Sequence, residues 1–115
     1  MDEALRLYNQ GKIPAAAKLA AQIVAARPRL AEAHNLMGVI MLAQGKTAEA
    51  IKAIGRATRL DPQNAQYFSN LGELERQRGK LQEAGIALRA AIEINPQHPQ
   101  ALNNLGILHY DRREF

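Results

Sequence analysis

The chain has 115 residues, of which 47% are hydrophobic and 23% are charged, a balance typical of a folded globular protein and not of a disordered one. It has no cysteine, which excludes disulfides, thiol catalysis and cysteine-based zinc sites. The formal charge is +4, but the basic residues are scattered and form no stripe interleaved with aromatic side chains, so a nucleic-acid partner is disfavoured.

The N-terminal region lacks the features of a targeting or membrane-spanning segment. Met1 is followed by two acidic residues, and the alanine-rich stretch 15–26 is interrupted by Lys18 and Gln22. A signal peptide would need a basic start and an apolar run, and a spanning helix would need about 20 apolar residues. We therefore expect a soluble, cytoplasmic protein that makes no contact with a membrane.

Residues 1–30 predict two helices, over 2–10 and 14–26. Gly11 separates the two apolar patterns, since glycine readily adopts the backbone of a tight turn. Pro14 suits the first turn of the second helix, where its missing N–H would have no partner.

Residues 31–64 predict two further helices, over 31–44 and 47–60, which are separated by Gly45. A glycine here can take the positive φ that ends a helix in a tight turn. Pro62 disfavours helical backbone in the residue before it and so ends the second helix.

Residues 65–98 repeat this plan, with helices predicted over 65–78 and 81–94 and a glycine, Gly79, between them. Asn64 precedes the first of these helices and is a good N-cap candidate. A last helix is predicted over 99–112.

One spacing recurs along the whole chain. Gly38, Gly72 and Gly106 are each 34 residues apart. A shared period of this size indicates one supersecondary unit copied in tandem and stacked on its neighbours. The same step of 34 separates three further sets of residues: Pro28, Pro62 and Pro96; Gly11, Gly45 and Gly79; and Ala16, Ala50 and Ala84.

The repeated unit resembles the tetratricopeptide repeat, a helix-turn-helix of 34 residues with the pattern W-x₂-L-G-x₂-Y…A-x₃-F…P. The resemblance covers essentially the whole chain, although His34, Glu75 and His109 stand where the family usually has an aromatic residue. The matching residues are His34, Met37, Gly38, Met41, Ala50, Ile54 and Pro62 in the first complete unit, and Phe68, Leu71, Gly72, Glu75, Ala84, Leu88 and Pro96 in the second.

This resemblance implies an all-α fold, a solenoid of about seven antiparallel helices that forms a right-handed superhelix. We expect a single domain over residues 1–115, with complete repeats at 31–64 and 65–98 and partial repeats at 1–30 and 99–115. Because the first and last units are incomplete, we interpret the chain as a fragment of a longer array.

The resemblance also implies a concave groove lined by the first helix of each unit. Such a groove binds an extended or helical peptide, so we expect a protein-interaction module with a protein or peptide partner. The candidate peptide-binding residues are Asn35, Val39, Leu42, Gln66, Asn70, Glu73, Arg76, Asn103, Asn104 and Tyr110.

Two of these asparagines carry a more specific interpretation. Asn70 and Asn104 are 34 residues apart and both precede Leu-Gly, so their side chains should align along the groove. An asparagine can bond the backbone of an extended peptide whatever its sequence. A similar ladder occurs in the tetratricopeptide region of O-linked N-acetylglucosamine transferases, although Asn-Leu-Gly is also common repeat sequence with an asparagine that merely faces solvent. Some members of the family bind the C-termini of chaperones through lysines and an arginine in the groove, an arrangement called the carboxylate clamp. This clamp is disfavoured here, because Asn35 and Val39 occupy two of its positions and nothing basic replaces them.

The last predicted helix has no following helix to cover it, so we expect its apolar face to mediate self-association. The residues expected there are Leu102, Leu105, Leu108 and Phe115. A solenoid usually ends in a cap with a polar outer face, and such a cap is not visible here. Homo-oligomerisation through this helix is therefore an alternative function, as a self-assembling scaffold.

No pattern indicates catalysis, a cofactor or a metal site. His34, His98 and His109 lie on different units and lack ligand spacing, and the Gly-Lys pairs follow helices and lack the context of a phosphate loop. We therefore expect no enzymatic activity within these residues. One further alternative is that the chain presents substrates to the catalytic domain of a larger, glycosyltransferase-like enzyme.

Overall fold

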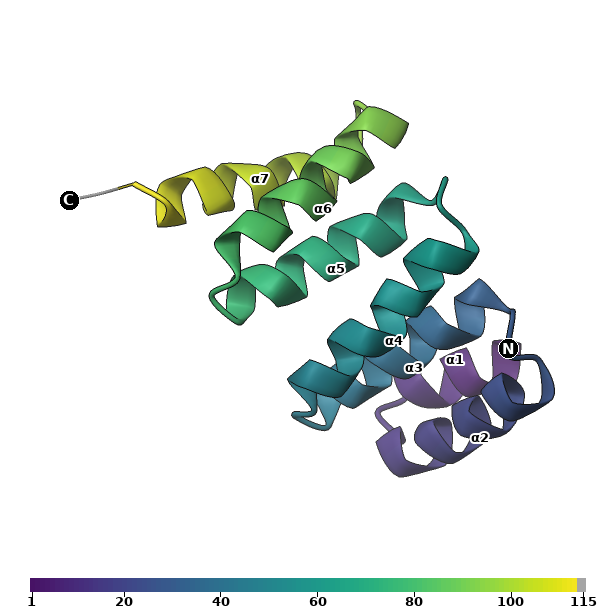
Figure 1. The fold of residues 1–115 in the computed structure, drawn as a ribbon. Coiled ribbons are helices and arrows are strands. Elements are labelled where there is room, and N and C mark those ends of the chain that lie inside the picture. Colours follow the sequence, from purple (N-terminus) through teal and green to yellow (C-terminus); the bar gives the residue numbers. More distant parts are fainter. Residues whose placement is uncertain (114–115) are drawn as a thin grey trace. The chain divides into compact units, whose positions relative to one another are not determined.

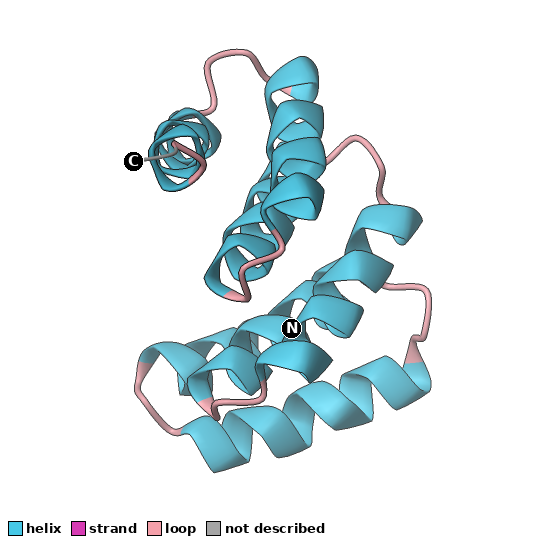
Figure 2. Ribbon diagram, turned by 60° about the vertical axis from the view of Figure 1, so that its left-hand side comes forward, coloured by secondary structure: helices cyan, strands magenta, loops and turns pink. Residues whose placement is uncertain are grey.

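The computed structural model describes residues 1–113, in which the chain forms helices joined by short loops and has no strand (Figures 1 and 2). All seven predicted helices are confirmed, and each end lies within one residue of its predicted position. None of the described helices combines the length and the apolar composition that crossing a membrane requires. The helices are α1 (Asp2–Asn9), α2 (Ile13–Ala26), α3 (Ala31–Ala43), α4 (Thr47–Leu60), α5 (Ala65–Gln77), α6 (Leu81–Ile94) and α7 (Pro99–Asp111).

The chain divides into two compact units. Unit 1 spans Met1–Pro62 and contains α1 to α4, and unit 2 spans Gln63–Phe115 and contains α5 to α7. The division falls two residues before the predicted repeat boundary between 64 and 65. In a repeat protein each unit packs mainly on its neighbours, so a repeat boundary is where such a chain can be divided.

The tight turns form where the glycine spacing predicts them. Gly45 and Gly79 have φ of 78° and 77°, in the left-handed region that favours glycine. After α3, the N–H of Lys46 donates to the carbonyl of Met41 at 2.8 Å, which closes the helix end in a Schellman motif. The next position in the series of Gly11, Gly45 and Gly79 is residue 113, where the chain has an arginine. The φ of Arg113 is not positive.

Side chains cap the first turns of α5 and α7. Oδ1 of Asn64 accepts a hydrogen bond from the N–H of Tyr67 at 3.2 Å, which confirms the predicted N-cap. At α7, Nδ1 of His98 accepts from the N–H of Ala101 at 3.1 Å. Histidine is not a usual N-cap residue, so the sequence did not indicate this second cap.

Within each complete repeat, a glycine lets the two helices approach closely. A Cβ built on Gly72 would lie 2.6 Å from Cγ of Leu88 and 3.2 Å from the carbonyl oxygen of Ala84, both on α6. Gly38 on α3 is equally crowded by Ile54 on α4. These helix pairs therefore pack at a distance that only a glycine allows.

The cores are built largely from alanine and leucine. In unit 1, Ala4, Ala16 and Ala20 of α1 and α2 pack with Leu36 and Ile40 of α3. In unit 2, one cluster joins Ala84 and Leu88 of α6 to Leu108 of α7, and another contains Ala65, Ala91 and Ala101. Small side chains at these contacts keep the helices close together.

The crowding at Gly72 and the free space at Gly106 give a matched pair of predictions. Gly72→Ala should lower the free energy of unfolding by about 1–3 kcal/mol, because Leu88 and the α6 backbone must shift. Gly106 occupies the same repeat position in α7, but nothing lies within 4 Å of a Cβ built on it. Gly106→Ala should therefore raise the free energy of unfolding by about 1 kcal/mol through helix propensity alone. Urea denaturation followed by circular dichroism measures both; equal effects of the two substitutions would contradict the packing described here.

Candidate functional site

In unit 2, polar side chains on α5 and α7 meet across the boundary between the two helices. Nε2 of Gln66 on α5 donates to Oε1 of Gln100 on α7 at 2.8 Å, and these two residues are 34 positions apart. Equivalent positions of successive repeats are therefore in direct contact. We call this surface the α5–α7 face; it consists of Gln66, Asn70, Glu73 and Arg76 of α5 and Gln100, Asn103, Tyr110 and Asp111 of α7.

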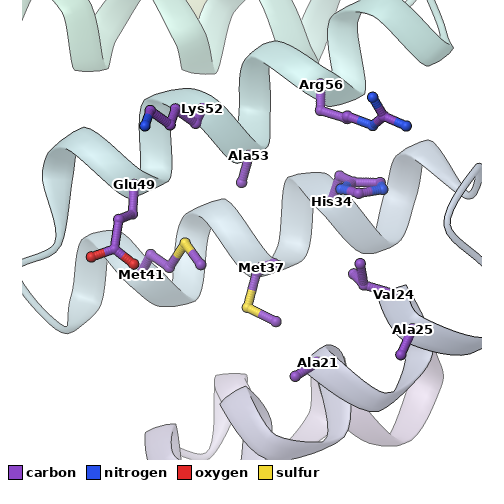
Figure 3. Close-up of a pocket in the computed structure, with 10 residues that line it drawn as sticks. All are labelled: Ala21, Val24, Ala25, His34, Met37, Met41, Glu49, Lys52, Ala53 and Arg56. Atoms are coloured by element: carbon purple, nitrogen blue, oxygen red, sulfur yellow. The ribbon is translucent and has the colours of Figure 1, made fainter.

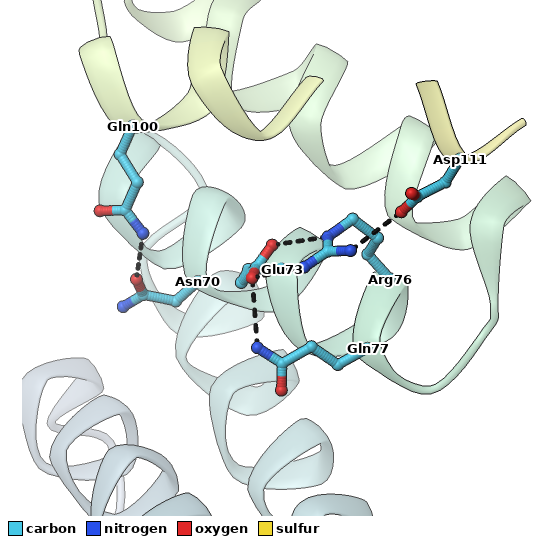
Figure 4. A network of polar contacts seen from close by, with 6 residues as sticks. All are labelled: Asn70, Glu73, Arg76, Gln77, Gln100 and Asp111. Atoms are coloured by element: carbon cyan, nitrogen blue, oxygen red, sulfur yellow. Dashed lines mark hydrogen bonds and ion pairs between the residues drawn. The ribbon is translucent and has the colours of Figure 1, made fainter. Parts of the chain in front are cut away.

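One half of the α5–α7 face is a cluster of amides. Oδ1 of Asn70 accepts from Nε2 of Gln66 at 2.8 Å and from Nε2 of Gln100 at 3.4 Å (Figure 4 shows the second bond). Gln100 also has a second N–H and a second lone pair beyond these bonds. Asn103, one turn further along α7, is exposed. The cluster thus presents amide groups to solvent in a fixed arrangement.

His98 fixes the orientation of this amide cluster. Its Nδ1 accepts the N–H of Ala101, so in the neutral ring the proton is on Nε2. Nε2 lies 3.1 Å from Oε1 of Gln66 and donates to it. The Gln66 amide is therefore held by a donor on its oxygen and by two acceptors on its nitrogen.

The other half of the α5–α7 face is a cluster of charges around Arg76 (Figure 4). Its guanidinium donates to both carboxylate oxygens of Glu73, each at 2.9 Å, and to Oδ2 of Asp111 on α7 at 2.9 Å. Gln77 donates to Glu73 as well, at 3.1 Å. The hydrogen bond from Arg76 lowers the pKa of Glu73, and the bonds to Glu73 and Asp111 raise the pKa of Arg76.

The charge balance of this cluster limits what it can bind. One guanidinium is shared by two carboxylates, so the group carries a net negative charge at neutral pH. Arg76 is about four-fifths buried and its donors are directed at Glu73 and Asp111. It is therefore poorly placed to take a carboxylate from a ligand.

Three of the groove candidates lie on α3 and one, Tyr110, lies near the end of α7 within the α5–α7 face. Asn35, Val39 and Leu42 are half-buried and follow one another along α3 in unit 1, at i, i+4 and i+7. Tyr110 on α7 is 61% exposed, and the guanidinium of Arg113 lies 5.5 Å from the centre of its ring.

Asn70 and Asn104, which the repeat spacing predicts to align along the groove, differ in their exposure to solvent. Asn104 is only 6% exposed, and its Nδ2 has no hydrogen-bond partner, whereas Asn70 is half-buried and belongs to the amide cluster. Leu36, at the same repeat position in α3, is also buried. Leu36 and Asn104 are thus buried in their units, whereas Asn70 at the same repeat position reaches the amide cluster, and Asn104 is not available on the face.

The residues expected to mediate self-association divide into two groups. Leu108 is fully buried against Ala84 and Leu88 of α6, so the prediction is wrong for this residue. Leu105 packs partly against the same cluster, and Leu102 is 45% exposed. Phe115 lies outside the described residues.

Glu75 occupies a position where the repeat pattern has an aromatic residue. It is 9% exposed and borders a cavity of about 260 Å³ that is lined mostly by apolar side chains of α5 and α6, among them Phe68 and Ile86. Burial raises its pKa, and the negative charge of Glu83 adds to the effect. The carboxylate is therefore held in a surrounding that favours its neutral form.

Asp111 of the α5–α7 face and the neighbouring His98 are functional residues that the sequence does not predict. Asp111 is 35 positions from Arg76, one more than the repeat period, so aligning the repeats does not bring the two together. His98 precedes α7 as its N-cap and also contacts Gln66, and neither role is indicated by the sequence pattern. An opposite charge close to one repeat length from Arg76 is the signal that could have revealed Asp111.

The helix pairs α3/α4 and α5/α6, each with a glycine at its close approach, and the polar face shared by α5 and α7 define the chain as a helical-repeat protein. The family model of the tetratricopeptide repeat matches residues 1–54 and 40–99. The chain therefore belongs to the tetratricopeptide repeat family. No curated protein matches it.

Solved structures with this fold include domains bound to peptides. The first tetratricopeptide repeat domain of Spaghetti (RPAP3), bound to the HSP90 peptide SRMEEVD, has a TM-score of 0.90 at 20% identity, covering 96% of this chain and 87% of that one. The Yersinia enterocolitica type III secretion chaperone SycD, in complex with a peptide of the translocator YopD, has a TM-score of 0.87 at 19% identity, with coverage of 97% and 91%.

An enzyme also contains a region similar to this chain. A mutant of the Thermobaculum terrenum O-GlcNAc transferase has a TM-score of 0.85 at 26% identity, covering 91% of this chain. The similar region is 20% of that enzyme's chain.

The burial of Glu75 predicts a dependence of stability on pH. Because its pKa is raised above the ordinary value of 4.5, the folded state holds the proton more tightly than the unfolded state does. This contribution to stability is present below the unfolded pKa and is lost as pH rises through the folded pKa. Glu75→Gln should therefore be more stable than the wild type at about pH 7, with a smaller advantage at about pH 4. Urea denaturation at both pH values measures the difference, with the exposed Glu93→Gln as control; an advantage that does not change with pH would contradict the assignment.

Proposed function

We propose that this chain is a protein-interaction module that binds an extended or helical peptide on the α5–α7 face. The observation that carries the proposal is the contact between Gln66 and Gln100, which places equivalent polar positions of two successive repeats side by side. Amides presented in this way offer both donors and acceptors to a peptide backbone. The peptides bound by the similar domains of Spaghetti and SycD support this class of ligand.

The charges of the face favour a neutral or basic peptide over an acidic one. Arg76 is already shared between Glu73 and Asp111, and this cluster has one more negative than positive charge. An acidic peptide such as the SRMEEVD bound by the Spaghetti domain would meet repulsion there. Tyr110, exposed at the same end of α7 beside the guanidinium of Arg113, adds an aromatic surface on which an apolar side chain can pack.

The row of Asn35, Val39 and Leu42 on α3 is proposed as a peptide contact of the same kind in unit 1. It combines one amide with two apolar side chains at helical spacing. Modest affinity is expected from each unit, because ordering a peptide offsets much of the energy gained from a shallow surface.

Removing two amides from the face should weaken peptide binding without unfolding the protein. A peptide selected from a displayed random library against the whole chain serves as the probe, and fluorescence anisotropy measures its Kd. Asn70→Ala combined with Gln100→Ala should raise Kd about tenfold, through the loss of two or three hydrogen bonds.

The matched control is Gln82→Ala combined with Gln97→Ala, which removes two exposed amides outside the face. This control should leave Kd unchanged, and thermal unfolding should be similar for both double variants. Equal Kd values for the wild type and the Asn70/Gln100 variant would remove the α5–α7 face as the peptide site.

Self-association through α7 is a second candidate function. Leu102, Ile107 and Tyr110 are exposed large apolar side chains on this helix, which supports an interface there. Leu108 is excluded from it, because it is already part of the core of unit 2.

A charge on the exposed part of α7 should abolish self-association. The wild type should show a rising average mass with concentration in sedimentation equilibrium, and Leu102→Glu should remain a monomer. Ile86→Glu, which alters an exposed isoleucine on α6, is the control and should behave like the wild type. If the wild type keeps the mass of a monomer at high protein concentration, self-association through α7 is contradicted.

Presentation of substrates within a larger, glycosyltransferase-like enzyme is a third candidate. Its support is the similarity to a region of the Thermobaculum terrenum O-GlcNAc transferase. A catalytic domain in the same full-length reading frame would favour this candidate, and a reading frame without one would argue against it.

A further inference from the structure

A groove crosses unit 1 between α2 and α4, with α3 as its floor (Figure 3). Its volume is about 500 Å³, within the range of pockets that accept ligands. We call it the α2–α4 groove. The side chains that matter here are Val24 of α2, Met37 and Met41 of α3, and Ala53, Lys52 and Arg56 of α4.

The floor and walls of the α2–α4 groove suit apolar side chains on a helix. Met37 and Met41 lie one turn apart on α3, and methionine adapts its shape to different apolar partners. The walls carry alanines, Ala21 and Ala25 on α2 and Ala53 on α4. Such small residues let the backbone of a second helix come close.

One wall of the groove is cationic. Lys52 and Arg56 are four residues apart on α4, so they share a face of that helix, and both are exposed. Among residues 1–113 neither forms an ion pair. At the Arg56 end, Nε2 of His34 donates to the carbonyl of Pro28 at 2.8 Å, which ties the loop between α2 and α3 to the groove.

The net positive charge of the chain lies in unit 1, the unit that contains the α2–α4 groove. Residues 1–62 contain nine basic and five acidic side chains, whereas residues 63–115 contain six of each. The +4 net charge therefore belongs to unit 1, and Arg27 and Arg29 extend it along the loop held by His34. A single carboxylate, Glu49, lines the groove at the opposite end.

The equivalent surface of unit 2 lacks these cations. The same repeat positions line the smaller cavity beside Glu75, but Ile86 stands in place of Lys52 and Ala90 in place of Arg56. Phe68 likewise stands in place of His34. The apolar hollow thus belongs to the repeat, whereas its cationic wall is particular to unit 1.

We propose that the α2–α4 groove is a second protein-interaction site, which docks an acidic amphipathic helix of a partner protein. Apolar side chains at i, i+3, i+4 and i+7 of that helix pack on Met37, Met41 and Val24. Its carboxylates face Lys52 and Arg56, whose unpaired charges supply the complementarity. The site differs from the α5–α7 face in location and in the charge of the peptide it takes.

The test uses the whole chain and two synthetic peptides. The probe is a helical peptide of about 18 residues with leucines on one stripe and glutamates elsewhere, and its counterpart carries lysines in place of the glutamates. Anisotropy should show saturable binding of the acidic peptide that weakens as salt is added. The basic peptide should bind about tenfold more weakly or not at all.

The second repeat supplies variants that are compatible with the fold. Lys52→Ile combined with Arg56→Ala installs the residues of unit 2 and should weaken the acidic peptide roughly fivefold to tenfold and flatten its salt dependence. Arg78→Ala combined with Lys80→Ala removes the same charge in unit 2 and should have little effect. Met41→Glu installs the residue that the second repeat has at this position, Glu75, and should abolish binding of the acidic peptide. Met41→Leu keeps an apolar side chain on the floor of the groove and should preserve binding.

The outcomes separate this site from the proposed peptide face. The double variant Asn70→Ala with Gln100→Ala should leave the Kd of the acidic peptide unchanged. The proposal for the α2–α4 groove and the proposal for the α5–α7 face can therefore be contradicted independently of each other. The proposal is overturned if the acidic peptide does not saturate, or if the Lys52/Arg56 variant binds it as tightly as the wild type does. Displacement of the acidic peptide by a single-stranded RNA that binds more tightly, or by a second copy of the chain, would also overturn it.

Discussion

The close approach of two helices within each repeat is the contact on which the rest of the structure depends. Gly38 and Gly72 lie against Ile54 and Leu88 so tightly that an added Cβ would force the facing side chain and the backbone beside it to shift. This contact fixes how the second helix lies on the first and so leaves one side of the first helix for other partners. In unit 2 that side carries the polar residues that meet α7. The position of the α5–α7 face is thus a consequence of the glycine contact.

The sequence predicts the helices and turns well, because residues with strong local preferences mark most of the boundaries. Glycines with positive φ, such as Gly79, end helices wherever the 34-residue step places them, and Asn64 caps α5 as expected. Burial of individual side chains was harder to predict. Leu108 and Asn104 are covered by their neighbours in unit 2, and a repeat pattern gives the average environment of a position without naming its contacts.

The candidate site could be predicted only as a set of positions. Resemblance to the family indicates which positions of the first helices face a ligand, but it does not reveal that Arg76 is shared by two carboxylates. That arrangement depends on Asp111, which lies one residue out of step with the repeat. The two proposed sites consequently differ in charge: the α5–α7 face favours neutral or basic peptides, and the cationic α2–α4 groove favours acidic ones.

The most direct test of the account is amide chemical-shift mapping of the whole chain with a peptide selected for binding. The central claim is that neighbouring first helices, held side by side by their repeat contacts, form the peptide-binding face. The account predicts that the shifted amides of unit 2 lie on α5 and α7, around Gln66, Asn70 and Gln100. Shifts confined to α6, with α5 and α7 unchanged, would contradict it.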